Sequence, residues 1–340
     1  MTVANALSAL ARRETLDEAT LTAALNEIAG GEVLPEKIGG LLMGIAARGA
    51  AVEELVAVVR FLRSRMVTIQ PRVETPLIDT CGTGGDGLGT FNISTTAAIL
   101  AAAAGAKIAK HGNRAASSKS GSADVLEALG VDTAASAERV RKSVETIGIG
   151  FLFAPAHHPV MKAVGPVRRS LGVKTIFNLA GPLSNPAGAR RQLVGVYAPE
   201  LMHLFAQALR ELGCERAMIV HGRDGLDEIT LTTPTDFVSL EPDGEIRGGV
   251  LDPKALGLPY CKPEDLAGGD PKANAEITRR ILSGTETGPA ATCVLVNAAA
   301  ALWVGGVSKD IKQGMALAAG AISSGAAGRT LEKLAEISRG

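Results

Sequence analysis

The fold is decided by one stretch, residues 79–124, which reads DTCGTGGDGLGTFNISTTAAILAAAAGAKIAKHGNRAASSKSGSAD. The apolar pair Leu77-Ile78 leads into it, glycines crowd residues 82–89, and an alanine-rich run ends at Gly105. This order predicts a strand, a glycine loop and then a helix. A helix N-terminus beside a glycine loop binds anions well, because its first amides have no partner within the helix. The stretch therefore predicts a phosphate site.

The glycine loop also satisfies the dinucleotide pattern G-x-G-x-x-G from Gly82 to Gly87. A dinucleotide site needs an acidic residue about 20 positions later to bind the ribose hydroxyls, and residues 88–122 contain none. Basic side chains stand there instead: Lys107, Lys110, His111, Arg114 and Lys119. They favour a second phosphate over a ribose diol. The loop lacks the Gly-Lys-Ser/Thr ending of a P-loop, which disfavours ATP hydrolysis. A tight turn with a solvated basic face is the structural alternative.

The composition is that of a large globular chain without net charge. Its 340 residues include 35 Lys and Arg against 35 Asp and Glu, so no overall field attracts nucleic acid. Aromatic residues make up 3%, which leaves few platforms for stacked bases. We therefore expect no nucleic-acid partner. The hydrophobic content of 46% predicts a large buried interior, and the length favours two subdomains.

Neither a membrane span nor an export signal is expected. Charges at Arg12, Arg13 and Glu14 interrupt the N-terminal segment before any long apolar core. The longest apolar run, near Ala290–Val304, carries Asn297 and is shorter than the ~20 residues of a spanning helix, so it predicts a buried helix. The four cysteines show no C-x-x-C spacing, which argues against a zinc site or a disulfide framework and favours a reducing cytoplasm.

The first 68 residues predict helices throughout. Thr15-Leu-Asp-Glu18 has the pattern of a capping box, Pro35 suits a first helical turn, and Gly49 ends an apolar run. Prolines and a lack of periodicity mark residues 70–76 as a connector, which we expect to act as a hinge.

From Leu77 onward, short apolar strands alternate with helices, which is the pattern of a mostly parallel sheet flanked by helices. The expected strands are 77–81, 107–111, 150–154, 192–197 and 217–221. The expected helices are 94–104 with Ser94 or Thr95 as its cap, 122–128, 138–147, 160–171 and 199–212. Residues 237–250 predict a hairpin, and helices return from Pro271. The fold class is therefore α/β, with a small all-helical domain and a larger domain built on the sheet.

Several long motifs occur along the chain in a specific order. They are GTGGD (82–86), NIST (92–95), KHGNR (110–114), SGSADVLEALG (120–130), FLFAPAHHPVMK (151–162), VRRSLGVKTIFNLAGPLSNP (167–186) and HGRDGLDEIT (221–230). Together they resemble the anthranilate phosphoribosyltransferase family over most of the chain. The resemblance implies transfer of the phosphoribosyl group of 5-phosphoribosyl 1-pyrophosphate (PRPP) to the amine of anthranilate. This reaction releases pyrophosphate and is the second step of tryptophan biosynthesis from chorismate.

The resemblance also implies a domain organisation. A helical domain of residues 1–70 is joined by helices from about 159–182, and residues 71–158 and 183–340 form the α/β domain that binds PRPP. It implies a cytoplasmic homodimer that associates through the helical domain. We expect the helical domain to close over the sheet about the 70–76 connector, because water must be excluded from the cationic sugar.

The family positions that contact PRPP have matches in both glycine-rich loops. The first loop and the helix after it supply Gly82, Gly85, Asp86, Thr90, Asn92, Ser94 and Thr95, and the second loop completes the pyrophosphate cradle with Lys110, Arg114, Ser117, Ser118 and Ser122. Amides and hydroxyls donate to phosphate, whereas an acid such as Asp86 suggests that a cation or a sugar hydroxyl shares the site. Taken singly, Arg114 and Ser117 fit a hydrophilic loop better.

The pair Asp227-Glu228 lies in a loop after an apolar strand, where both carboxylates can converge on one hard cation. Composition alone favours a solvated turn for such a pair. The resemblance implies instead that Asp227 and Glu228 hold magnesium and that Ser94 contributes to magnesium on the pyrophosphate, with two ions per active site.

The matched positions for the aromatic acceptor are Gly82, His111, Asn113 and Arg168. Arg168 can pair with the anthranilate carboxylate in a forked geometry, and Asn113 can bond to its carboxylate or amine. An aniline-type amine is already a neutral nucleophile, so we expect His111 to position the acceptor and assign no residue as an acid or base. Catalysis is then electrostatic, through Lys110 and the metal.

Some points stay open at this level. Lys174 stands where the family often has arginine, a change that keeps the charge and loses the planar fork, and we expect little effect on acceptor choice. His157 and His158 fit a structural role as well as a functional one. A pyrimidine nucleoside phosphorylase-like enzyme shares the glycine loop but lacks a pair like Asp227-Glu228, and a catalytically silent ligand-binding homologue is the third alternative.

Overall fold

The computed structural model describes residues 2–115 and 119–340. Ser117 and Ser118, two of the expected phosphate ligands, lie outside the described residues.

The chain begins with a group of helices that carries the N-terminus: α1 (Val3–Ala11), α2 (Glu18–Ala29), α3 (Pro35–Arg48) and α4 (Val52–Arg65). Pro35 occupies the first turn of α3 and Gly49 ends it, as expected. The capping box expected at Thr15–Glu18 is wrong. The helix begins after Asp17, whose Oδ1 accepts from the Thr20 amide at 2.7 Å, because Asp17 stands three residues before that amide and Thr15 does not.

One sheet forms the centre of the larger domain. Its strands within the described residues are β1 (Ile78–Gly82), β2 (Ile108–Gly112), β3 (Ile149–Phe153), β4 (Arg191–Gly195), β5 (Arg216–Gly222), β6 (Thr235–Leu240) and β7 (Ile246–Leu251). Their order is β3-β2-β1-β4-β5-β6-β7. The first five run parallel, and β6 and β7 add the expected hairpin antiparallel at one edge. The prediction of a mostly parallel sheet beside a small helical domain is confirmed.

The other helices connect the strands or cover the sheet. They are α5 (Ile93–Ala103), α6 (Ser122–Ala128), α7 (Ala137–Ile147), α8 (Ala154–His157), α9 (Met161–Leu171), α10 (Ile176–Ala180), α11 (Leu201–Glu211), α12 (Pro271–Leu282), α13 (Pro289–Gly305), α14 (Ile311–Ser323) and α15 (Ala326–Arg339). The apolar run near Ala290–Val304 is the buried helix α13, as expected. No helix within residues 2–115 and 119–340 has the length and apolar character needed to cross a membrane.

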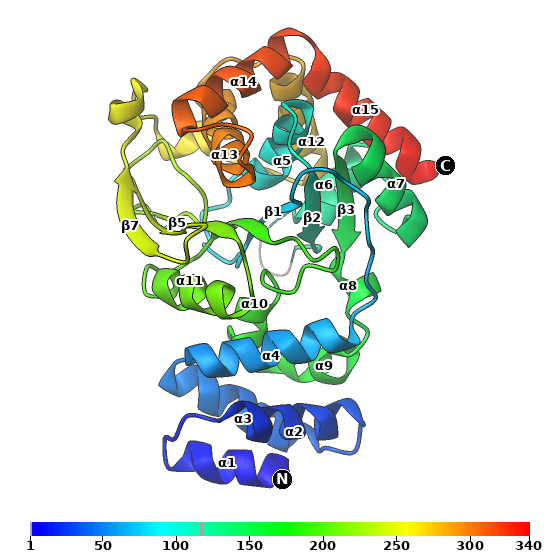
Figure 1. The fold of residues 1–340 in the computed structure, drawn as a ribbon, viewed down its shortest axis with the longest axis vertical. Coiled ribbons are helices and arrows are strands. Elements are labelled where there is room, and N and C mark those ends of the chain that lie inside the picture. Colours follow the sequence, from blue (N-terminus) through cyan, green and yellow to red (C-terminus); the bar gives the residue numbers. More distant parts are fainter. Residues whose placement is uncertain (1, 116–118) are drawn as a thin grey trace.

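Alternate residues of the strands face two different cores. Leu193 and Met218 pack into the core formed with α5 and α13, whereas their neighbours Val194 and Ile219 pack into the core shared with α11 and the N-terminal helices. Figure 1 shows the resulting layers, with α5 and α12–α15 on one side of the sheet and α11, α10 and then α1–α4 on the other. The helical domain therefore lies on the face opposite the C-terminal helices.

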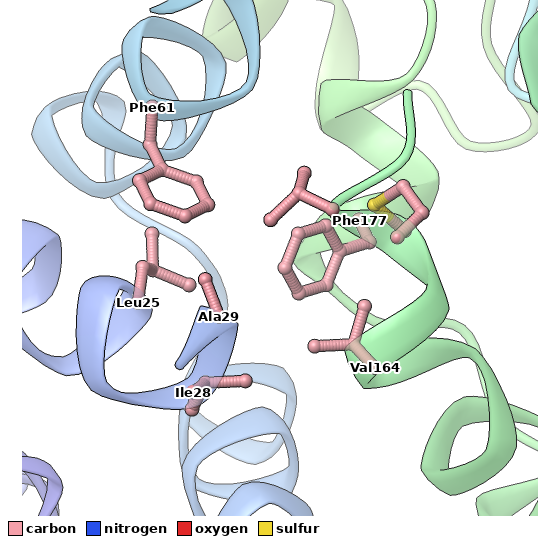
Figure 2. Close-up of a pocket in the computed structure, with 8 residues that line it drawn as sticks. Leu25, Ile28, Ala29, Phe61, Val164 and Phe177 are labelled. Carbon is pink, nitrogen blue, oxygen red and sulfur yellow. The ribbon is translucent and has the colours of Figure 1, made fainter. Parts of the chain in front are cut away.

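The helices α9 and α10 pack against the N-terminal helices although they are distant in sequence, with α9 against α2 and α3 and α10 against α4. Figure 2 shows this interface, where Leu25 and Phe61 face Val164 and Phe177 across an apolar cavity of about 10 Å³. So small an apolar space holds no ligand. The domain boundaries given above stay a prediction.

The connector between the two domains is anchored near its start. Val67 donates its amide to the His157 carbonyl at 2.8 Å, and the His157 Nδ1 lies 2.6 Å from the Val67 carbonyl. Ile69 donates to the Pro186 carbonyl at 3.1 Å and its side chain is buried. His157 thus has a structural role, and the hinge expected at residues 70–76 stays a prediction.

Candidate active site

The site lies at the point where the sheet changes its direction of winding. From β1, the chain adds β2 and β3 on one side, and it then returns to place β4 and β5 on the other. Ligands of open parallel sheets bind outside the carboxyl ends of the strands at such a point. Here the carboxyl ends are Gly82 of β1 and Gly195 of β4, which are paired. The glycine loop starts from this pair.

Asp227 packs closely against both glycines at the ends of these strands. A Cβ on Gly195 would lie 1.5 Å from the Asp227 carbonyl oxygen, and a Cβ on Gly82 would lie 2.7 Å from Asp227 Oδ2. No side chain fits at Gly195, and one at Gly82 would displace the Asp227 carboxylate. Because Gly82 and Gly195 have no side chains, the loop that carries Asp227 can pack directly against the glycine loop.

The glycine loop itself has a conformation that favours glycine. Gly84 and Gly85 have φ angles of 65° and 75°, in the left-handed region. The Gly84 amide donates to Asp227 Oδ2 at 2.8 Å. Asp86 Oδ1 accepts from the Leu88 amide at 3.2 Å and stabilises the turn. The loop that the sequence assigns to phosphate is thus joined to the loop assigned to metal.

The second carboxylate meets the N-terminus of α5. Glu228 Oε1 accepts from the Ser94 amide at 3.1 Å. The cap expected at Ser94 or Thr95 is wrong, because α5 begins one residue earlier with Asn92 as its N-cap, and Ser94 and Thr95 lie inside the first turn. The Asn92 side chain makes no cap hydrogen bond, since Ser120 Oγ and Asn274 Nδ2 donate to its Oδ1 at 3.1 and 2.9 Å.

The carboxyl groups of Asp227 and Glu228 lie in surroundings that disfavour their negative charge. Although both residues keep part of their surface accessible, burial of the carboxyl groups raises the pKa of Asp227 to about 7 and that of Glu228 to about 8. The neighbouring charge of Asp86 adds to the shift at Asp227, and the charge of Asp227 adds to the shift at Glu228. Clustered acids that resist ionisation beside an anion-binding loop fit the oxygen donors that magnesium prefers. In the described part of the chain, no group of three or more His, Cys, Asp or Glu residues is arranged to hold a metal ion.

Lys110 is buried between β1 and β2. Its Nζ donates to the Thr80 carbonyl at 2.5 Å, and burial lowers its pKa while the charges of Asp79 and Glu228 oppose the shift. The two strands pair in register only at Ile78 and Ile108, although β1 pairs with β4 along its whole length. Lys110 therefore replaces a backbone partner where β1 and β2 diverge.

Asp79 on β1 also spans the space between β1 and β2. It is a buried polar residue that the family motifs do not include. Its Oδ1 accepts from the His111 amide at 3.1 Å and its Oδ2 accepts from Asn185 Nδ2 at 2.7 Å. The side chain is fully buried, and this burial raises its pKa to about 6. Asn185 also donates to the Ala109 carbonyl at 2.8 Å. The sequence does show an acid inside an apolar strand, which could have indicated a buried polar role. Its partners, His111 and Asn185, are distant in sequence and are known only from the fold.

Arg114 and Asn113 of the second loop make their contacts within the chain. Arg114 donates to Glu127 at 2.5 and 2.8 Å and to Asp124 at 3.1 Å, which places its guanidinium on carboxylates. The Asn113 carbonyl accepts from Ser122 Oγ at 3.2 Å and closes the loop onto the start of α6. Thr90 forms an isolated bridge with Ala267. The contacts of Arg114 and Asn113 thus hold the second loop to α6 and its flanking residues.

On the acceptor side, His111 packs against His158, with ring centroids 5.1 Å apart. Burial lowers the pKa of His111 to about 3 and that of His158 to about 4, and the ring charge of His158 adds to the shift at His111, as that of His157 does at His158. Within the described residues His111 Nε2 has no hydrogen-bond partner. The nitrogen is buried, and a ring in these surroundings is unsuited to holding an additional proton.

Arg168 lies on α9 and is held from α10. Its Nη2 donates to Asn178 Oδ1 at 3.3 Å, and its guanidinium lies 5.7 Å from the centroid of the Phe177 ring. Burial lowers its pKa, which is the effect of removing water from a cation that has no paired carboxylate in the described residues. Such an arginine can receive an anionic ligand.

Comparison with known proteins finds matches over most of the chain. Residues 4–66 match the model "Glycosyl transferase family, helical bundle domain", and residues 74–328 match "Glycosyl transferase family, a/b domain". The chain is 49% identical over 332 residues to an anthranilate phosphoribosyltransferase of Thermoanaerobacter sp., covering 98% of this chain and 96% of the relative. It is 50% identical over 336 residues to the Rhodospirillum rubrum enzyme of that name, covering 97% and 94%.

The chain belongs to the anthranilate phosphoribosyltransferase family.

Solved structures of this family share the fold. The Thermus thermophilus anthranilate phosphoribosyltransferase superposes with a TM-score of 0.91 at 42% identity, covering 98% of this chain and 99% of that one. The Saccharomyces cerevisiae enzyme, solved in complex with PRPP and Mg, superposes with a TM-score of 0.90 at 28% identity, covering 99% and 98%. A further structure of the yeast enzyme contains 4-fluoroanthranilate.

Proposed function

We propose that this chain transfers the phosphoribosyl group of PRPP to the amine of anthranilate, giving N-(5-phosphoribosyl)anthranilate and pyrophosphate in the second step of tryptophan biosynthesis. The observation that carries the proposal is the junction of the two loops. Asp227 accepts from Gly84, and Glu228 accepts from Ser94 at the start of α5. An anion-binding loop that is bonded to two carboxylates with raised pKa values is suited to an anion that arrives with its own cation.

The pyrophosphate end of PRPP is assigned to the glycine loop and the first turn of α5. The donors are the loop amides and the hydroxyls of Ser94 and Thr95, with Thr90, Asn92, Arg114 and Ser122 as further contacts. Lys110, which is buried between β1 and β2, contributes positive charge close to Glu228. Departure of pyrophosphate increases negative charge at this place, and fixed donors there stabilise it without reorganisation.

Magnesium is assigned to Asp227, Glu228 and Ser94, with two ions in each site. Bound magnesium would neutralise charge on the leaving pyrophosphate. The protein's own part would be to hold the two carboxyl groups beside the loop, which the hydrogen bonds to Gly84 and Ser94 support.

Anthranilate is assigned to the side of the site that carries Gly82, His111, Asn113 and Arg168. The Arg168 guanidinium would pair with the carboxylate, and the neutral His111 ring would orient the amine. Because the amine is already a neutral nucleophile, its nitrogen can attack C1 of the ribose as the bond to pyrophosphate breaks. The proton is lost from the product nitrogen afterwards and needs no dedicated base.

The assembly around this chemistry is also proposed from the family. The chain acts in the cytoplasm as a homodimer that associates through the helical domain, and the helical domain closes over the sheet when both substrates are bound. Scattering profiles with and without both substrates test the closure, since identical profiles would contradict it.

The test of the function is an assay with three arms. We expect anthranilate fluorescence to disappear when PRPP and magnesium are supplied, and a chelator to prevent the loss. Phosphate-dependent cleavage of a pyrimidine nucleoside would support the phosphorylase instead. Turnover in neither assay would leave the silent ligand-binding homologue.

A further inference from the structure

Lys174 lies outside the assigned ligands, in the segment that joins α9 to α10. The segment is fixed at both ends. Gly172 ends α9 with a φ of 64°, and the Thr175 amide donates to Asn178 Oδ1 at 2.9 Å to start α10. The same Asn178 oxygen accepts from Arg168 Nη2 at 3.3 Å. The backbone beside Lys174 is therefore tied to the arginine on the acceptor side.

The side chain of Lys174 crosses from this segment to the glycine loop. Its Nζ donates to the Gly85 carbonyl at 2.8 Å and lies 3.1 Å from the centroid of the Tyr197 ring. Tyr197 in turn donates its amide to Thr83 Oγ1 at 3.1 Å. The loop is thus held on both sides of Gly84, directly at Gly85 and through Tyr197 at Thr83.

A side chain at Gly85 would displace Lys174. A Cβ on Gly85 would lie 2.9 Å from Lys174 Cε, and the φ of 75° is unfavourable for other residues. The charges of Asp227 and Asp86 also act on the ammonium group, which places Lys174 among the carboxylates of the site. Lys174 is half-buried and Gly85 is exposed, so the contact lies at the surface of the loop.

We infer that Lys174 is a positioning residue that straps the α9–α10 segment to the glycine loop and fixes the orientation of the Gly85–Asp86 peptide. Because a trans peptide is planar, holding the Gly85 carbonyl toward Lys174 turns the Asp86 amide the opposite way. The inference rests on the proposed function in one respect, that the anion meeting this loop is PRPP. The chain of contacts from Arg168 through Asn178 and Lys174 then joins the acceptor side to the phosphate side.

The strap depends on the contacts that Lys174 makes with Gly85 and with Tyr197. An ammonium over the face of an aromatic ring is stabilised there, and the ring keeps the flexible lysine stem aligned with the loop. Arginine at this position can make the same donation and stack on the same ring. A side chain without a donor cannot.

The experiment compares Lys174→Met with Lys174→Arg and with the matched control Lys333→Met, which removes an exposed lysine from α15. Hydrogen exchange is measured on residues 83–88 of the substrate-free protein, so this readout does not depend on the proposed reaction. We expect about ten- to hundred-fold faster exchange in Lys174→Met, as for loss of a hydrogen bond to a charged group. Lys174→Arg and Lys333→Met should exchange like the parent protein.

Steady-state kinetics then connect the strap to catalysis. We expect Lys174→Met to raise the KM for PRPP about ten- to hundred-fold and to change kcat much less, with recovery in Lys174→Arg. Unchanged exchange in Lys174→Met, or failure of arginine to restore it, would overturn the strap. Faster exchange without transferase activity in the parent protein would support the strap and reject the proposed function.

Discussion

Gly195 at the end of β4 lies against the backbone of Asp227, so closely that a Cβ would come within 1.5 Å of the Asp227 carbonyl oxygen. The loop that carries Asp227 and Glu228 reaches the glycine loop only because this position has no side chain. The site thus depends on close backbone packing as well as on its polar residues.

Gly195→Ala should therefore displace the carboxylate loop. We expect the free energy of unfolding to fall by about 3 kcal/mol, as in severe overpacking, and turnover to be lost together with magnesium dependence. Urea unfolding and the anthranilate fluorescence assay measure the two effects. Gly320→Ala is the control, since a Cβ on this glycine of α14 meets nothing within 4 Å, and we expect no loss of either property. Full activity in Gly195→Ala would show that the loop can shift without harm.

The raised pKa values of Asp227 and Glu228, about 7 and about 8, predict a pH dependence of stability. Both lie above the value of about 4 in an unfolded chain, so the unfolded state ionises first. In the absence of metal, stability from these groups is fully present below about pH 4 and is lost as the pH rises through about 7 and 8. A double variant, Asp227→Asn with Glu228→Gln, should show a flatter profile in urea unfolding between pH 5 and 9. A parent protein that gains stability relative to this variant over that range would contradict the assignment.

Magnesium should reverse the loss, because it binds the ionised carboxylates. We expect its affinity to rise by about tenfold per pH unit for each proton released, which means up to about a hundredfold per pH unit near pH 6, where both carboxyl groups are protonated, and less toward pH 8. Calorimetry in buffers that differ in ionisation enthalpy measures the proton count. Binding without proton release at pH 6.5 would place the metal elsewhere.

His111 has a pKa lowered to about 3 by burial and so stays neutral at every pH at which the protein is assayed. We expect kcat/KM for anthranilate to show no limb near pH 6.5 that depends on His111. His111→Asn should raise the KM for anthranilate and leave the shape of the pH profile unchanged. Disappearance of an acidic limb in the variant would assign His111 as a general base.

Asn185 joins β1 to β2, because its Nδ2 donates to both the Asp79 carboxyl group and the Ala109 carbonyl. Asn185→Ala leaves a buried carboxyl and a buried carbonyl without this donor, so we expect the free energy of unfolding to fall by about 1–3 kcal/mol. The neighbouring Ser184→Ala removes only a local hydrogen bond to Ala180 and serves as the control for a buried polar deletion. Equal effects in the two variants would show that Asp79 does not depend on Asn185.

The elements were predictable from the sequence where the signals are local. Glycines 82–89 between a short apolar run and an alanine-rich helix specify strand, loop and helix, and β1 and α5 follow that order. The helix caps were less predictable, because several polar residues near each start can serve. At α5 the N-cap is Asn92, whose side chain is bound to Ser120 and Asn274, and the latter is distant in sequence.

The site was predictable as a set of residues but not as a set of contacts. Family motifs named Asp227, Glu228 and the glycine loop, whereas their hydrogen bonds to Gly84 and Ser94 join segments far apart in sequence. Lys174 departs from the family pattern, from which we expect little effect on the acceptor. Its hydrogen bond to Gly85 of the glycine loop joins segments far apart in sequence, which no local pattern could indicate.

The central claim is that the glycine loop and the Asp227-Glu228 loop form one site for magnesium and PRPP. Calorimetry of PRPP binding with magnesium present, on the parent chain and on the Asp227→Asn, Glu228→Gln variant, tests it most directly. We predict binding to the parent chain, and binding weakened at least about tenfold both in the variant and when a chelator is added. No binding to the parent chain with magnesium present, or equal binding to both proteins, would contradict the claim.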